Sequence, residues 1–441
     1  MIRHFLVLLS FIIYICAPYN YSFVWCVISL VVFLLTSFYI FYKDFKNEVF
    51  GFNLLFTIAY FASNYIFPVF IYPINESYSL FHHGYDVNVI SKCTSLATLA
   101  FSLYACGFIK KPKKEKSKNS LYIGNNETIV IALCALFTFF VFVALGGLTF
   151  YINQYANSTI ERGGVYMYVN LFVSMFMTMS GVCLYYNNKK WVWLLLILIT
   201  ISILITGSRT LPIAVASVLA YVYISKHNVS TFMLMGGLLI GVIILFAIGM
   251  TRTSSATLQD SVATTTDIGL WAVFTDLVVT NRDLYDTYSF VDSGMMLWGL
   301  NFIGPILAVI PFGQSLFCYL TGAKWYEMSS AAFITYQAFG EDASTGLGTN
   351  LVGDVYLGAG VVGVFVMFYL LGYFVRKSRD KMRSSKDVVS AVFYLTMLSN
   401  AVFICRGSYF VFFKNFVWGL VTIYIINSLY RSVQKSSSLK T

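Results

Sequence analysis

Long apolar runs separated by short polar connections constrain the fold of this 441-residue chain more than any other feature. A helix of about 20 apolar residues crosses the hydrocarbon core of a bilayer, where only helices and closed barrels satisfy their backbone groups. The composition agrees, because hydrophobic residues make up 58% and charged residues 11% of the chain. We therefore predict an all-α polytopic membrane protein with about 12 transmembrane helices. The apolar runs cover 5–18, 21–42, 49–72, 89–109, 127–147, 165–186, 191–206, 211–225, 231–250, 350–375, 388–405 and 410–430.

The charges in the connections predict the orientation of these helices. Most of the 29 lysines and arginines follow every second run, whereas the alternate connections hold most of the acidic residues. Because positive charges gather on the cytoplasmic side, both termini are expected in the cytoplasm. The net charge of +10 is then an orientation signal and does not indicate binding to nucleic acid.

The same pattern divides the chain into nine helices, a large extracytoplasmic loop, three further helices and a basic cytoplasmic tail, which cover 1–250, 251–349, 350–430 and 431–441. The loop therefore lies between the ninth and tenth helices. Its apolar segment 295–320 is interrupted by Pro305 and Pro311. If this segment crossed the bilayer once, the basic cluster after the tenth helix would move outside. We expect the segment to re-enter the membrane or to lie on its surface.

Arginines on the expected outer side indicate an anionic partner. Lysine predominates on the inner side as a headgroup anchor, whereas the outer side favours arginine, whose planar fork suits bidentate contact with phosphate. A bound anion and simple anchoring to lipid phosphates both account for a single arginine, but the set together favours the anion. The candidates are Arg209, Arg252, Arg282 and Arg406.

A glycine-rich entry to the helix after the large loop supplies candidate carboxylates. Glu341 and Asp342 precede it, and Asp354 falls about one turn inside the helix. A carboxylate within hydrogen-bond reach of a sugar hydroxyl can act as a general base, and partial burial makes it a stronger one. The structural alternative is that the glycines allow close helix packing and that Asp354 pairs with an arginine.

Cysteine and histidine patterns predict neither a disulfide framework nor a metal site. No two of the eight cysteines form a C-x-x-C pair, the spacing that marks many zinc sites. His82 and His83 are adjacent in an outer loop, and the sequence has no H-E-x-x-H or D-x-D motif. We therefore expect no metal and no cofactor.

The chain resembles bacterial O-antigen polymerases of the Wzy type. The resemblance lies in the twelve-run layout with a late outer loop, in Gly207-Ser208-Arg209 at the start of a helix, and in the run from Gly348 to Gly363. It implies a GT-C-like, metal-independent glycosyltransferase of the bacterial inner membrane. Such an enzyme extends an undecaprenyl-pyrophosphate-linked oligosaccharide by repeat units and works with a chain-length regulator protein. The outer arginines would neutralise the pyrophosphate leaving group.

Under this resemblance Asp354 and Glu341 are the candidate catalytic carboxylates, and Thr349 and Asn350 are candidate glycan-binding residues. Related O-antigen ligases usually place a histidine just before the helix that follows the loop, where this chain has Thr349 and Asn350. That departure shifts the expected base to a carboxylate. Two alternatives stay open. One is an O-antigen ligase, which transfers the glycan to lipid A core, and the other is a flippase or secondary transporter, many of which also have twelve spans.

Overall fold

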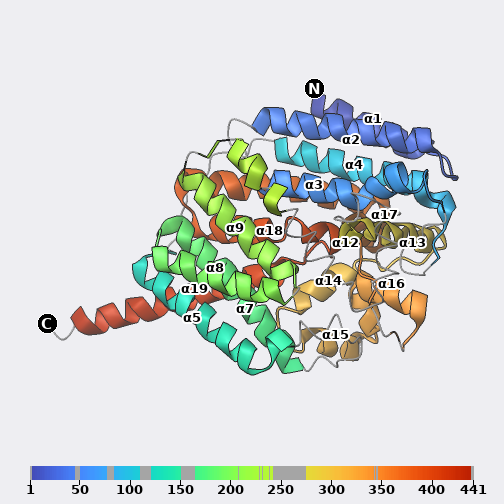
Figure 1. Cartoon of the computed structure of the whole chain (residues 1–441). Helices are drawn as coiled ribbons and strands as arrows, with labels where there is room; N and C mark the ends of the chain where they lie inside the picture. Colours follow the sequence, from blue (N-terminus) through green and yellow to red (C-terminus); the bar gives the residue numbers. More distant parts are fainter. Residues whose placement is uncertain are drawn as a thin grey trace. The chain divides into compact units, whose positions relative to one another are not determined.

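The computed structural model describes residues 2–44, 50–76, 84–109, 121–149, 164–206, 208–227, 229–230, 232–237, 239–241, 275–341, 343 and 346–438. All regular secondary structure in these residues is helical, as Figure 1 shows. The α-helices are α1 (Ile2–Cys16), α2 (Phe23–Asp44), α3 (Phe52–Asn64), α4 (Ile90–Ile109), α5 (Asn125–Ala144), α7 (Gly164–Tyr186), α8 (Lys190–Ile205), α9 (Thr210–Lys226), α12 (Thr275–Val278), α13 (Thr280–Asp292), α14 (Leu300–Leu307), α15 (Gly313–Thr321), α16 (Ser330–Phe339), α17 (Leu351–Ser385), α18 (Val388–Ser399) and α19 (Phe413–Ser438). A π-helix, η1 (Phe67–Ile71), and the 3-10 helices η2 (Val87–Val89), η4 (Trp325–Met328) and η5 (Phe403–Arg406) complete the set.

Five of the described helices are long and apolar enough to cross a membrane. They are Phe23–Lys43, Val87–Ile109, Asn125–Ala144, Tyr168–Tyr186 and Leu351–Ser385. Shorter apolar helices of 10–17 residues are Ile2–Cys16, Lys190–Ile205, Thr210–Lys226, Phe232–Gly241 and Val388–Ser399. The prediction of a helical protein with several membrane spans is confirmed. The count of twelve spans and the GT-C-like arrangement stay predictions.

Two apolar runs that we expected as single helices, 49–72 and 388–405, are each broken at a Ser-Asn pair. The amide of Asn64 donates to the carbonyl oxygen four residues back (3.0 Å), and Asn400 does the same (2.9 Å). At the second break the side chain takes the carbonyl of Thr396 and the backbone N–H of Asn400 bonds that of Met397 instead (3.1 Å), so the α-helical pattern ends there. At the first break the backbone N–H of Tyr65 still bonds the carbonyl of Phe61 (3.0 Å). The chain continues as the π-helix η1 after the first break and as the 3-10 helix η5 after the second.

The basic cluster Arg376–Lys386, expected as a connection, is almost entirely helical, because α17 continues to Ser385. The helix is bent at Ala359 and Gly360. Gly360 has a φ of +59°, a conformation that glycine adopts without the steric cost of a side chain. The bend therefore occurs at a residue that tolerates it.

Packing divides the chain into two compact units, and each unit joins segments that are distant in sequence. The first unit comprises Met1–Lys113, Thr264–Lys377 and Ala401–Val411. The second comprises Lys114–Ala263, Ser378–Asn400 and Phe412–Thr441. The described part of the expected outer loop, with α12 to α16, thus packs in one unit with the N-terminal helices.

In the first unit α4 packs beside α1 and α2 (Figure 1) and is buried along its length. Hydroxyl groups link these helices, because Ser102 contacts Ser10 (2.7 Å) and Ser95 contacts Ser29 (3.2 Å). Such small polar residues allow close helix approach inside a membrane protein. α4 also contacts α13, η1 and η2, and so connects them with the two N-terminal helices.

α4 and α17 approach each other backbone to backbone, so a methyl group at their contact is expected to be strongly destabilising. A Cβ atom on Gly372 would collide with the carbonyl oxygen of Tyr104, and one on Gly107 with that of Tyr369. Backbone cannot move aside as a flexible side chain can, and overpacking typically costs about 1–3 kcal/mol or more. Gly372→Ala should therefore reduce the amount of folded protein in membranes, measured by fluorescence-detected gel filtration. Gly84→Ala, with nothing within 4 Å of the added carbon, is the control. Equal levels of the two variants would contradict the close contact.

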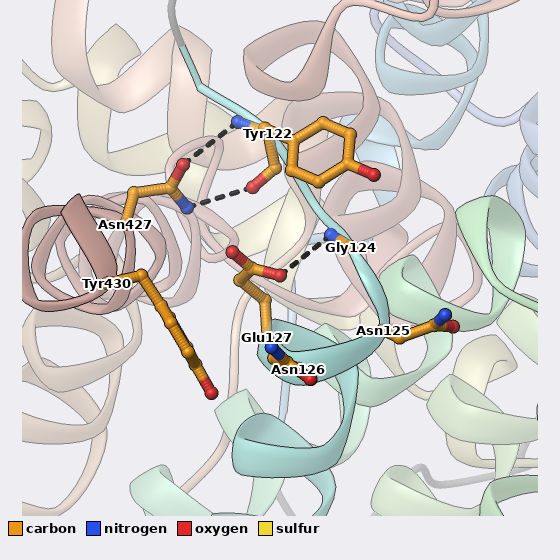
Figure 2. A pocket seen from close by; sticks show the side chains of 7 residues that line it. All are labelled: Tyr122, Gly124, Asn125, Asn126, Glu127, Asn427 and Tyr430. Atoms are coloured by element: carbon orange, nitrogen blue, oxygen red, sulfur yellow. Dashed lines mark hydrogen bonds between the residues drawn. The ribbon is translucent and has the colours of Figure 1, made fainter. Parts of the chain in front are cut away.

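In the second unit α7 packs against α5, α9, α18 and α19. Asn427 of α19 holds the backbone of Tyr122 by two hydrogen bonds, 2.8 and 3.1 Å long, and Glu127 accepts from the backbone N–H of Gly124 (2.9 Å). Figure 2 shows these contacts around a cavity of about 420 Å³ at the start of α5. Its lining consists of Tyr122, Gly124, Asn125, Asn126, Glu127, Asn427 and Tyr430. Because no lysine or arginine lines it, this cavity is poorly suited to a pyrophosphate.

Candidate functional site

α13 carries the most unusual side chains of the first unit. Its sequence TNRDLYDTYSFVD is polar, yet every residue from Thr280 to Tyr288 is buried. The helix packs against α3, α4 and α16. Charged side chains are rarely buried, because removing an ion from water costs several kcal/mol that a partner must offset. A buried, charged helix in a chain this apolar is therefore a candidate for function.

Arg282 and Asp283 form an ion pair that is completely buried. The Nη2 atom of Arg282 lies 2.7 Å from Oδ1 of Asp283, and its Nε lies 3.3 Å from the same oxygen. Nη2 also lies 3.5 Å from the carbonyl oxygen of Leu347, in the entry to α17. The second carboxylate oxygen, Oδ2, has no hydrogen-bond partner among the described residues. It faces Gly348, where an added Cβ would lie 3.6 Å away.

Asp286 lies one helical turn beyond Asp283 and has a raised pKa. Burial raises the pKa of Asp286 to about 7, and the negative charge of Asp283 adds to the shift. Burial also raises the pKa of Asp283 to about 6, although Arg282 and then Arg406 oppose that shift. A carboxyl group with a pKa close to neutral pH is suited to accepting a proton during catalysis.

Arg406 brings a second positive charge to this cluster. It is the last residue of η5 and is half-buried, and its guanidinium is near enough to Asp283 to lower the pKa of that carboxyl group. η5 packs against α3, which also contacts α13. We name Arg282, Asp283, Asp286 and Arg406 the α13–η5 cluster.

The structure brings together two of the four arginines predicted to bind pyrophosphate. Arg282 and Arg406 belong to the first unit. Arg209 occupies the N-cap position of α9 in the second unit. Arg252 lies outside the described residues, as do His82, His83 and Asp342.

Asp354 is buried one turn inside α17, as predicted, but its contacts are those of a structural residue. Oδ1 accepts from Nδ2 of Asn301 (2.9 Å), and Oδ2 accepts from the backbone N–H of Tyr409 (2.8 Å). The side chain is 0% exposed. Asp354 thus ties α17 to α14 and to the segment that follows Arg406. Its geometry favours a positioning role over that of the base.

Thr349 and Asn350, predicted to bind glycan, are also buried in the entry to α17. The side-chain oxygen of Asn350 accepts from the backbone N–H groups of Val352 (2.8 Å) and Gly353 (3.4 Å), which caps the helix. Thr349 accepts a hydrogen bond from Ser330 (2.9 Å). Glu341, by contrast, is exposed just beyond the C-terminus of α16.

Sequence reasoning did not single out Asp283 and Asp286, because they fall in a polar stretch of the expected loop. Their spacing of three residues, directly after Arg282, was a readable signal, since such residues share one face of a helix. Across the described ranges no three His, Cys, Asp or Glu side chains form a group that could hold a metal ion.

The fold and the cluster are those of a multi-pass, helical membrane protein with a buried arginine–aspartate pair, a second buried aspartate and a half-buried arginine. The family model of the O-antigen polysaccharide polymerase Wzy matches residues 1–435. The chain therefore belongs to this family of membrane polymerases, which act on lipid-linked oligosaccharide repeat units. No curated protein and no solved structure matches the chain.

Proposed function

We propose that this polymerase transfers a growing glycan from undecaprenyl pyrophosphate to a lipid-linked repeat unit, on the extracytoplasmic face of the bacterial inner membrane and without a metal ion. Family membership supports the polymerisation of O-antigen repeat units. The α13–η5 cluster supports the proposed transfer from pyrophosphate, because it combines two arginines with two carboxyl groups whose pKa values are raised.

The arginines of the cluster are proposed to stabilise the leaving group. When the anomeric carbon–oxygen bond breaks, negative charge develops on the pyrophosphate, and fixed cations at that point lower the barrier. Arg406 is half-buried and is the direct contact in this proposal. Arg282 is fully buried and acts indirectly. It contributes its positive charge and positions Asp283 through their ion pair. Arg209 and Arg252 remain proposed ligands of the same anion.

A carboxylate is proposed to take the proton that the acceptor hydroxyl loses as the new glycosidic bond forms. Asp286 is our first candidate, because the pKa of about 7 allows it to accept a proton near neutral pH. Burial keeps that pKa high, and like-charge repulsion from Asp283 adds to the effect. Asp354 holds the segment that carries Arg406 through the backbone of Tyr409. The exposed Glu341 is the second candidate for the base.

Reconstitution tests the proposed reaction. The purified protein in nanodiscs, given only undecaprenyl-pyrophosphate-linked repeat units, is expected to produce a ladder of longer glycans in excess EDTA. A requirement for Mg²⁺ or Mn²⁺ would contradict metal independence. In cells, deletion is expected to leave core carrying one repeat unit. Bare core with accumulated lipid-linked polymer would instead indicate a ligase, and loss of both surface forms would indicate a flippase.

Cysteine labelling tests the proposed side of the membrane. Lys324 and Ser384 are both exposed, and the orientation proposed here puts them on opposite faces. Lys324→Cys is therefore expected to react with an impermeant maleimide once the outer membrane is opened, whereas Ser384→Cys should react only after the inner membrane is lysed. The exposed Cys16 and the partly exposed Cys134 and Cys318 are removed from both variants by Cys16→Ser, Cys134→Ala and Cys318→Ser. The reverse pattern would place the active face in the cytoplasm.

A further inference from the structure

α14 and α15 present a large apolar surface that no described part of the chain covers. Residues 295–323 contain no charged side chain. α15 has no buried residue, and Tyr319 and Leu320 are 86% and 72% exposed. Leu316, Ile310 and Ile306 are exposed as well. Exposed apolar patches of this kind mark sites of contact with membranes or proteins.

The surface is held rigidly from its inner side. An added Cβ on Gly304 would collide with the carbonyl oxygen of Met328, so α14 lies directly on η4. Gln314 ties α15 to α14 by donating to the carbonyl oxygen of Gly304 (2.9 Å). Leu297 is buried in a hydrophobic core with Tyr326, Phe333 and Leu357. The contacts on the inner side therefore fix the position of the exposed apolar side chains of α14 and α15 in the first unit.

Two exposed aromatic residues, Trp298 and Phe312, lie in turns where the backbone is strained. Trp298 has a φ of +50° and is 83% exposed, and Phe312 has a φ of +62° and is 78% exposed. A positive φ is unfavourable for such bulky residues, and glycine would be the unstrained choice. An aromatic side chain kept at a strained and exposed turn has no folding role that accounts for it, which points to an external contact.

The dimensions and the composition identify that contact as lipid. α14 has 8 residues and α15 has 9, so neither approaches the roughly 20 residues that a bilayer crossing requires. Tryptophan and tyrosine favour the boundary between headgroups and acyl chains, where Trp298 and Tyr319 would lie. The absence of charge in this segment disfavours a polar protein partner or water.

We infer that α14 and α15 form a monotopic insertion, a pair of short helices that lie in the headgroup–acyl boundary of the bilayer without crossing it. Since they belong to the same packing unit as α13, the insertion sets the depth of the α13–η5 cluster relative to the lipid headgroups. It is a second membrane contact of the protein, distinct from the spanning helices, and does not depend on the proposed reaction.

Fluorescence quenching tests the insertion. A single NBD label is placed at Tyr319→Cys, in a background of Cys16→Ser, Cys134→Ala and Cys318→Ser. The protein is reconstituted in nanodiscs of phosphatidylethanolamine and phosphatidylglycerol. We expect strong quenching by a nitroxide on the acyl chain near the glycerol and little by aqueous iodide. A label at Lys324→Cys, close by in the chain and exposed, should show the opposite preference.

Iodide quenching of the Tyr319 label as efficient as at Lys324 would overturn the inference, because the helix would then face water. Protection from both quenchers would also overturn it, since another part of this chain or a second copy of it would then cover the surface. If Tyr319→Cys does not fold, the label is placed at Leu316→Cys on the same helix. Leu316 is 59% exposed, so the same pattern of quenching is expected there.

Discussion

Asp286→Asn is expected to lower the rate of glycan polymerisation by purified protein at least about 100-fold, the usual contribution of a positioned general base. The substitution keeps the size of the side chain but removes its ability to accept a proton. Because a neutral amide also avoids the cost of a buried charge, the variant should fold at least as well as the wild type. The rate is measured from lipid-linked repeat units in nanodiscs, with thermal unfolding of the same sample as the check on folding.

Asp292→Asn is the matched control, because Asp292 is the last residue of the same helix and is exposed. It should polymerise at the wild-type rate. A folded Asp286→Asn variant with the activity of this control would remove Asp286 from the mechanism. Loss of activity in Glu341→Gln instead would move the role of the base to the exposed carboxylate.

Arg282→Met is expected to prevent stable folding, because it leaves Asp283 buried without its cation. Removal of one partner of a buried ion pair typically costs about 3–5 kcal/mol, a large part of the stability of a protein. The loss should be greatest at alkaline pH. The pKa of Asp283 is already raised to about 6, and without Arg282 it rises further, so at acidic pH the carboxyl group takes up a proton and becomes neutral.

Replacement of both partners separates folding from function. Arg282→Met with Asp283→Leu leaves no unpaired charge, and such apolar replacements of buried pairs are often neutral or stabilising. The double variant should therefore recover folded protein, measured by thermal unfolding, but polymerise slowly, because the cluster has lost a cation. Wild-type stability of the single variant would show that the pair is not coupled.

The membrane class and the main helices could be predicted because they depend on local composition. The apolar runs correspond to α2, α4, α5 and α7 with small shifts at their ends. The breaks at Asn64 and Asn400 could not be predicted in the same way. Both asparagines lie within apolar runs, and whether such a side chain bonds the preceding turn depends on the packing around it.

The site was only partly predictable, because burial depends on contacts between distant segments. The sequence placed Asp354 inside a helix, and the structure agrees. Its partners, Asn301 and the backbone of Tyr409, are 53 and 55 residues away, so neither was visible in the local pattern. Asp283 and Asp286 looked like ordinary loop residues for the same reason. Their raised pKa values arise only when α13 packs against α3 and α4.

The pH dependence of kcat/KM for polymerisation tests the role of the α13–η5 cluster most directly. The protonated carboxyl group of Asp286 cannot accept a proton, so kcat/KM should rise with pH and level off above a midpoint of about 7. In Asp283→Asn the amide oxygen can still accept a hydrogen bond from Arg282, and Asp286 becomes the counter-charge of that arginine, with thermal unfolding as the check on folding. Because the like charge is gone, the pKa of Asp286 falls and the midpoint should move to lower pH. A wild-type profile without this rise, or a midpoint that stays in place in Asp283→Asn, would contradict the assignment of the cluster as the catalytic centre.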